Sequence, residues 1–185
     1  MLRRLAEPGP GKRVLDVGCG NGYNVGQYLA WGCSAGVGVD VSDVGIGIAR
    51  RTYPAARFEV LEIAPDVPAR LGESPFDIVS STEVVEHLYD PHAWARCCFN
   101  ALAPGGRLVC STPYHGYVKN LAISLAGGWD RHWEALREGQ HIKFFSRSTL
   151  RRLLADVGFV NMVFAGAGRV PLLWKSMLVR AERPR

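Results

Sequence analysis

The stretch VLDVGCGNG, at residues 14–22, constrains the fold more than any other part of the sequence. It begins as a short apolar run bounded by glycine, which is typical of a buried parallel strand. Gly18, Gly20 and Gly22 follow at alternate positions, and residues without a Cβ atom let the backbone turn sharply and let a ligand approach the peptide groups. We therefore expect a strand, a ligand-binding turn and then a helix.

The rest of the chain alternates between strand and helix patterns. Apolar runs predict five strands, at residues 13–18, 35–41, 57–63, 76–82 and 107–112. Capping residues and helical spacing predict helices at 23–32, at 42–51, from 90 to the APGG sequence at 103–106, and at 146–158. The final stretch, at 159–184, is predicted to form two further strands with no helix between them.

This order of elements predicts an α/β fold. We expect a doubly wound, seven-stranded, mostly parallel sheet with an antiparallel C-terminal edge hairpin. The length of 185 residues suits one domain, spanning 1–185, and a hydrophobic content of 48% is enough for a core. Ligands of such sheets bind outside the carboxyl ends of the strands, so the residues that follow each strand are the candidates for function.

Two acids occupy such positions. Asp16 lies two residues before the first glycine, where its carboxylate would repel a pyrophosphate and attract an ammonium group, directly or through water. Asp40 ends the second strand, where a carboxylate can accept both hydroxyls of a ribose. S-adenosylmethionine is a ligand of this kind, because it has an ammonium group at one end and a ribose further along. The competing interpretation is a pair of acids that cap turns.

Four stretches carry a family resemblance: VLDVGCGNG, GVGVDVS, FDIVSSTEVVEHL and LAPGGRLVCSTP. In this order they resemble the class I (Rossmann-like) S-adenosylmethionine-dependent methyltransferases, and the motifs are most similar to the ubiquinone-biosynthesis O-methyltransferase type. The resemblance implies a methionine end held by Asp16 and the glycine turn, a ribose on Asp40 and an adenine beside Val41. The full implied cofactor set is Asp16, Gly18, Cys19, Gly20, Asp40, Val41, Glu62 and Thr82.

The sequence STEVVEHLYDPH follows the fourth strand and offers candidates for the chemistry. Glu83, Glu86 and His87 lie at i, i+3 and i+4, so a helical turn would place them on one side, and GQHIKFF brings His141 back later. In two branches of the family, which act on ubiquinone precursors and on terminal riboses of small RNAs, such a set goes with a divalent cation. Mg²⁺, Mn²⁺ or Zn²⁺ would suit these ligands. The alternatives are a metal-free role for His87 or His141 as base or substrate contact, and a structural role.

A long insert, at about 113–145, separates the fifth strand from the late helix. Its aromatic residues and the apolar sequence NLAISLA predict a substrate lid over an acceptor pocket, with peripheral membrane contact as a further expectation. The alternative is that the apolar residues simply pack on the sheet. Only a dozen residues precede the first strand, so we expect the cofactor either to be more exposed or to be covered by the insert or by a second subunit in a homodimer.

Composition narrows the class of protein further. The five cysteines form no CxxC pair, and no long apolar segment or signal peptide is recognisable, which favours a cytoplasmic protein. The net charge is +5, but the basic residues are dispersed, which disfavours a nucleic-acid partner. The prediction is a methyltransferase that modifies a hydroxyl of a small aromatic or metabolite acceptor. The cofactor motifs do not identify the acceptor atom, so N- or C-methylation of a small acceptor is one alternative. The others are an RNA terminal-ribose 2'-O-methyltransferase and a non-catalytic cofactor-binding subunit.

Overall fold

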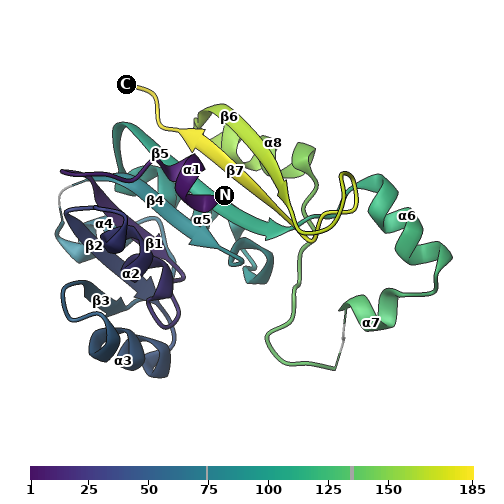
Figure 1. Ribbon diagram of the computed structural model, residues 1–185, viewed down its shortest axis with the longest axis horizontal. Coiled ribbons are helices and arrows are strands. Elements are labelled where there is room, and N and C mark those ends of the chain that lie inside the picture. Colours follow the sequence, from purple (N-terminus) through teal and green to yellow (C-terminus); the bar gives the residue numbers. More distant parts are fainter. Residues whose placement is uncertain (74, 134–135) are drawn as a thin grey trace.

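The computed structural model describes residues 1–73, 75–133 and 136–185. Its centre is a seven-stranded sheet in the order β3-β2-β1-β4-β5-β7-β6 (Figure 1). Strands β1 to β5 pair in parallel, and β7 is antiparallel to both β5 and β6. The strands are β1 (Arg13–Val17), β2 (Ala35–Asp40), β3 (Arg57–Val60), β4 (Phe76–Thr82), β5 (Leu102–Pro113), β6 (Val160–Ala167) and β7 (Ser176–Glu182).

Helices cover both faces of the sheet. Residues of α4 (Val67–Leu71), α5 (Pro91–Ala101) and α8 (Arg147–Val157) join the largest buried cluster on one face. Residues of α1 (Leu2–Ala6), α2 (Tyr23–Ala30) and α3 (Asp43–Thr52) pack in two smaller clusters with the other side chains of the strands. This division follows from β1, where Leu15 and Val17 belong to the first cluster and Val14 belongs to one of the others.

The predicted fold class is confirmed, with differences at the ends of elements. The predicted strand at 57–63 stops at Val60, because β2 ends at Asp40 and the Leu61 amide makes the last bond to it. The predicted strand at 107–112 extends back to Leu102, which pairs with Phe76 before the register shifts. The short helices α1 and α4 were not predicted. The edge hairpin is present, with β7 inside it and β6 outermost.

The insert leaves the sheet at the carboxyl end of β5. It contains α6 (Tyr117–Leu125) and α7 (Trp129–Trp133), which lie beyond the end of the sheet (Figure 1). Its two ends meet where Tyr114 forms a parallel bridge with Phe145. The apolar sequence NLAISLA belongs mostly to α6, which projects from the sheet rather than packing on it. In the described part of the chain, no helix combines the length and the apolar character that a membrane span requires.

A buried chain of hydrogen bonds attaches α5 to the sheet close to the carboxyl ends of β4 and β1. The indole nitrogen of Trp94 in α5 donates to the Ser81 hydroxyl at 3.0 Å, and that hydroxyl donates to the Val17 carbonyl at 2.8 Å. Trp94 is fully buried, so its N–H needs this partner. The chain links α5, β4 and β1 at the edge where the functional residues gather.

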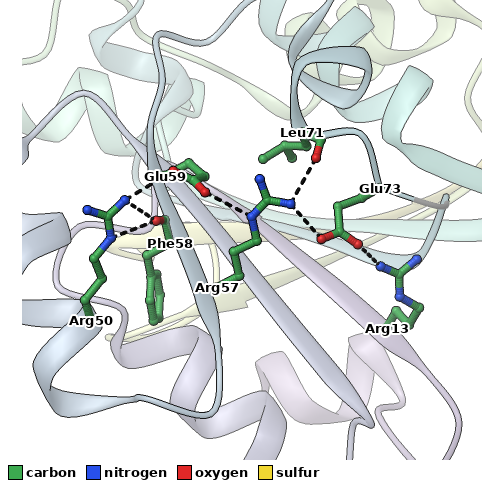
Figure 2. Close-up of polar contacts among 7 residues, drawn as sticks. All are labelled: Arg13, Arg50, Arg57, Phe58, Glu59, Leu71 and Glu73. Carbon is green, nitrogen blue, oxygen red and sulfur yellow. Dashed lines mark hydrogen bonds and ion pairs between the residues drawn. The ribbon is translucent and has the colours of Figure 1, made fainter.

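An ion-pair network ties the opposite, amino end of the same strands (Figure 2). Glu73, after α4, contacts Arg13 at the start of β1 and Arg57 at the start of β3. Arg57 continues to Glu59 at 3.0 Å, and Glu59 continues to Arg50 of α3 at 3.2 Å. Arg50 also donates to the Phe58 carbonyl. Because β3 is a short edge strand, these side chains supply anchoring that its few backbone bonds do not.

We predict that Glu73→Gln lowers the free energy of unfolding by about 0.5–1 kcal/mol near pH 7, because two partly solvated ion pairs lose their charge. The hydrogen bond from Arg57, opposed by partial burial and aided by Arg13, holds the pKa of Glu73 below its usual value. The stabilisation is therefore present above that ordinary value and is lost as the pH falls through the lowered pKa. Urea denaturation at pH 7 and pH 3 measures the difference. Glu138→Gln, at an exposed position, is the control, and an equal effect there would contradict the network.

Candidate active site

The glycine turn after β1 is fixed by its neighbours. The amides of Gly18 and Cys19 both donate to the Val39 carbonyl of β2, at 2.8 and 3.0 Å. Gly18 has φ +78°, and a Cβ atom there would lie 2.5 Å from a methyl group of Val84. Any side chain at Gly18 would therefore clash as well as strain the backbone. Backbone bonds to β2 therefore fix the start of the turn, and a side chain at Gly18 is not tolerated there.

Asp40 is oriented by the same turn. Its Oδ2 accepts from the Gly20 amide at 2.8 Å, and its Oδ1 accepts from the Ser42 amide at 2.9 Å. Ser42 in turn caps α3 by accepting from the Gly45 amide at 3.0 Å. Each carboxylate oxygen can accept more than one hydrogen bond, so Asp40 is rigid and can still bind a ligand.

A first cleft, of about 510 Å³, opens at this edge of the sheet. Val41 lines it with a side chain that is 65% exposed although it is apolar, as expected for a surface that a flat ligand covers. Four residues of the predicted cofactor set line this cleft: Gly18, Asp40, Val41 and Glu62. Ile63, Val84, Leu88, Tyr89 and Ala93 also line it and were not predicted.

The rest of the predicted cofactor set, Asp16, Cys19, Gly20 and Thr82, does not line this cleft. Thr82 accepts from the Asn24 amide at 2.8 Å. The side chain of Cys19 faces the core, because a Cβ atom at Gly38 would lie 2.7 Å from its sulfur. Asn24 was not identified from the sequence, where it carries no signal beyond its place near the glycines.

Asp16 is fully buried and has an unusual environment. Among the described residues, neither of its carboxylate oxygens has a hydrogen-bond partner, although the Ser80 hydroxyl and the Asn24 amide are close enough to act on it electrostatically. Burial raises the pKa of Asp16 to about 7, Ser80 and Asn24 oppose that shift, and the charge of Asp40 adds to it. A buried carboxylate without partners is costly, and a cationic ligand group would neutralise it.

A second cleft, of about 520 Å³, lies beside the first. It is lined mainly by the end of the insert, and it shares His87 and Tyr89 with the first cleft. The remaining lining residues are Trp133, Arg137, Gly139, Gln140, His141 and Ile142. Two adjoining clefts with a common wall can hold two reactants next to each other.

Glu86, His87 and His141 come together at that common wall. One possible ligand atom from each of the three side chains lies within 4.8 Å of the others. Glu86 is buried; its Oε2 accepts from the Thr112 hydroxyl at 2.9 Å, while its Oε1 has no hydrogen-bond partner among described residues and lies 4.0 Å from Nε2 of His141. Burial raises the pKa of Glu86 to about 7, whereas burial and the neighbouring His87 lower the pKa of His141.

Glu83 does not join this group, and the predicted helical turn is wrong. The turn is a short 3₁₀ helix, η1, at Val85–His87, and Glu83 precedes it with φ +53°. Its amide donates to the Ser111 carbonyl at 2.9 Å, and its Oε1 accepts from the Ser111 hydroxyl at 2.7 Å. These bonds to β5 turn Glu83 away from the helical direction, so Glu83 lines the first cleft separately from Glu86.

Comparison with known proteins agrees with this geometry. The family model described as "Methyltransferase domain" matches residues 1–162. A ubiquinone biosynthesis O-methyltransferase from Cereibacter sphaeroides is 35% identical over 187 aligned residues, which cover 93% of this chain and 70% of the relative.

Two solved structures share the fold. An S-adenosylmethionine dependent methyltransferase from Mesorhizobium loti has a TM-score of 0.74 at 20% identity, covering 98% of this chain and 95% of that one. A putative methyltransferase in a complex with the Haloferax volcanii Trm112 methyltransferase activator has a TM-score of 0.75 at 18% identity, covering 100% of this chain and 86% of that one. At these identities the likeness shows the fold alone. From the family match and the relative, the chain belongs to the class I S-adenosylmethionine-dependent methyltransferases.

Proposed function

We propose that the enzyme transfers a methyl group from S-adenosylmethionine in the first cleft to a hydroxyl of a small acceptor in the second. The observation that carries this proposal is the common wall of the two clefts, which contains His87 and Tyr89. Holding two reactants together in a fixed orientation supplies a large part of the acceleration in a displacement reaction. The relative from Cereibacter sphaeroides, named as an O-methyltransferase, supports a hydroxyl as the acceptor group.

The residues around the first cleft fit the cofactor chemically. The Asp16 carboxylate is buried and has no hydrogen-bond partner within the described ranges, and it suits the ammonium of the methionine end, through a direct bond or a water. Asp40 suits the ribose hydroxyls and Val41 the adenine face. In the same proposal the turn at Gly18, Cys19 and Gly20 contacts the methionine end, with Thr82 behind it, and Glu62 accepts from the adenine amino group.

The transfer itself needs little covalent help from the protein. The acceptor oxygen forms a bond to the methyl carbon as the carbon–sulfur bond breaks, and the sulfur keeps that electron pair as a neutral thioether. The acceptor hydroxyl must give up its proton. His141 suits this role, because its lowered pKa keeps the ring neutral and able to accept a proton near pH 7. His87 is the second candidate, and its ring centroid is 4.8 Å from that of His141.

The same cluster fits a divalent cation. Glu86, His87 and His141 offer one carboxylate and two imidazoles, which suit Mg²⁺, Mn²⁺ or Zn²⁺, and the partnerless Oε1 of the buried Glu86 is the kind of atom that a cation satisfies. A cation bound there would lower the pKa of a hydroxyl next to it. Thr112 holds the other oxygen of Glu86 in place, and Glu83 would contribute only from the edge of the first cleft.

The remaining expectations from the sequence are also part of the proposal. The insert at 113–145 acts as the lid of the acceptor cleft, since Trp133 and His141 come from it. A single domain over 1–185, a cytoplasmic location, a homodimer and peripheral membrane contact through α6 stay predictions. So do the alternative activities, on the terminal ribose of RNA or as a non-catalytic cofactor-binding subunit.

A screen of acceptors tests the central claim. We expect methyl transfer from labelled S-adenosylmethionine to catechols, flavonoids or quinone precursors, because the second cleft contains Tyr89 and Trp133 for a flat acceptor. Short RNAs in the same screen are expected to stay unlabelled. Labelled RNA with unlabelled small molecules would replace this proposal with the ribose activity. Cofactor binding without transfer to any acceptor would favour the non-catalytic subunit.

For Asp16→Asn we expect opposite effects on binding and stability. Losing the carboxylate should weaken binding of S-adenosylmethionine by about 100-fold. The ligand-free protein should gain about 1–3 kcal/mol at pH 8, because the pKa of about 7 means that ionising this buried group costs stability as the pH rises from about 4 to 7. At pH 4, where Asp16 is protonated, the gain should nearly vanish.

Calorimetry and urea denaturation provide the two readouts for Asp16→Asn. Asp66→Asn, at an exposed position, removes the same charge and serves as the control. Unchanged cofactor binding by Asp16→Asn would refute the role of this carboxylate.

The cation is tested by removing it. We expect EDTA to lower turnover about tenfold or more, and readdition of Mg²⁺, Mn²⁺ or Zn²⁺ to restore it and raise the melting temperature. His141→Gln should abolish the metal-dependent rise in melting temperature, while His92→Gln, at an exposed histidine of α5, should keep it. Full activity and an unchanged melting temperature in EDTA would exclude the cation and leave the histidines as proton acceptors.

A further inference from the structure

Lys119 is a buried cation with little to balance it. It lies in the first turn of α6 and is only 4% exposed. Its Nζ donates to the Tyr114 carbonyl at 2.8 Å. An ammonium has three donors, and no carboxylate of the described residues forms an ion pair with this one. A buried charge without a counter-ion is unfavourable, so this position suits a ligand that brings a negative charge.

Three other nitrogen-bearing side chains interact electrostatically with Lys119, and two of them, His115 and His132, have ring centroids 6.1 Å apart. Burial and then the charge of Arg169 lower the pKa of Lys119, and Glu83 is the acid that opposes them. The pKa of His132 is lowered by burial and by both Lys119 and Arg169. Burial lowers the pKa of His115 to about 4, with Lys119 and His132 contributing. Lys119 and Arg169 therefore supply the positive charge, while the two histidines are neutral near pH 7 and offer ring nitrogens. These four residues, from α6, the β6–β7 loop, α7 and the segment after β5, are called the cation cluster below.

The backbone adds to the positive potential of the cation cluster. Gly116 precedes α6 and offers no side chain to cap it, and the first turn of α6 contains no acid. The amino-terminal end of this nine-residue helix therefore carries a partial positive charge near Lys119. Arg169 is exposed, has φ +62° and makes no hydrogen bond or ion pair with any described residue. A non-glycine residue is rarely held in this conformation without a reason.

The cation cluster is next to the acceptor cleft. Tyr114, which holds Lys119, follows the carboxyl end of β5, the edge of the sheet at which both clefts open. Glu83, which lines the first cleft, acts electrostatically on Lys119, and His132 acts on His141, which lines the second. Arg137 adds a further cation to the lining of the second cleft.

We propose that Lys119, Arg169, His132 and His115 form an anion-binding site that holds a carboxylate or phosphate group of the acceptor. The methyl acceptor is then an acidic hydroxy compound, with its hydroxyl near His141 and its acidic group at the cation cluster. The assignment of the acceptor class rests on the proposed methyl transfer, whereas the anion site does not depend on it. The insert thus selects the substrate by charge as well as by covering the cleft.

Binding of inorganic phosphate tests the site without any reaction. We expect saturable binding by calorimetry to protein that has been saturated with S-adenosylhomocysteine, weakened about tenfold or more in Lys119→Met and in Arg169→Gln. Lys119→Met keeps the apolar stem and should melt at the same temperature or higher, since it removes an unbalanced buried charge. Arg152→Gln, exposed on α8, is the matched control for charge. If Lys119→Met folds poorly, Arg169→Gln still tests the site, because a substitution at this position in an exposed loop should leave the fold intact.

The outcomes distinguish the two proposals. Absence of saturable phosphate binding by the parent protein, or equal loss in Arg169→Gln and Arg152→Gln, overturns the anion site. If S-adenosylhomocysteine fails to bind while phosphate still binds at the cation cluster, the proposed methyl transfer fails and the site stands.

A second arm of the experiment tests the acceptor class. We expect 3,4-dihydroxybenzoate to bind about tenfold more tightly than its neutral amide, and Arg169→Gln to remove that preference. Equal binding of acid and amide overturns the acidic acceptor. Vesicles of phosphatidylglycerol, compared with phosphatidylcholine, are the third arm. Vesicle binding that depends on Lys119 and Arg169, without preference for the acid in solution, would assign the cation cluster to lipid headgroups and overturn the proposal.

Discussion

The parallel pairing of β1 with β2 and β4 is the constraint on which the site depends. It sets Asp16 opposite Gly38 on one side and Ser80 on the other, inside a sheet covered by helices on both faces. A carboxylate in that position cannot reach water, and its neighbours do not complete its hydrogen bonds. The fold therefore maintains a costly charge near the centre of its sheet, which is reasonable only if a ligand compensates for it.

The features that the sequence predicted correctly were those that depend on local patterns along the chain. The strands predicted at 13–18 and 35–41 lie within one residue of β1 and β2, so Asp16 and Asp40 were correctly expected near the carboxyl ends of these strands. Residues placed by distant contacts were not predicted correctly. Glu83 leaves the helical direction because Ser111 of β5 binds it, and β3 stops where its only parallel neighbour stops. Neither partner can be identified from spacing along the chain.

The burial of Lys119 could not be predicted from the sequence either. In the helical pattern of α6 it is a cation among apolar residues, and such a residue is normally solvated. It is covered because the insert returns to β5 at the bridge between Tyr114 and Phe145, and the His115 amide donates to the Phe145 carbonyl at 3.0 Å. The insert therefore provides most of the lining of the second cleft and also contains the unbalanced charge of Lys119.

The end of the insert is also hydrogen-bonded directly to η1. The Glu86 carbonyl accepts from the amides of Ile142 and Lys143, at 2.9 and 3.0 Å, so η1 and the end of the insert are held together. The His115 ring stacks on Phe144 at 4.2 Å between centroids, which continues this contact toward the cation cluster. Because these bonds attach residues 142 and 143 to Glu86, they also keep the neighbouring His141 beside the Glu86 side chain.

The distribution of charge between the clefts follows the charges of the proposed reactants. The first cleft has the acids Asp40, Glu62 and Glu83 in its lining and Asp16 behind it, which suits a cofactor with a sulfonium and an ammonium. The insert and the β6–β7 loop together supply the cation cluster, which suits an acidic acceptor. Opposite fields would draw each reactant to its own cleft and disfavour exchange between them. After transfer the cofactor product has lost its sulfonium charge, so its attraction to the acids weakens and its release becomes easier than that of the substrate form.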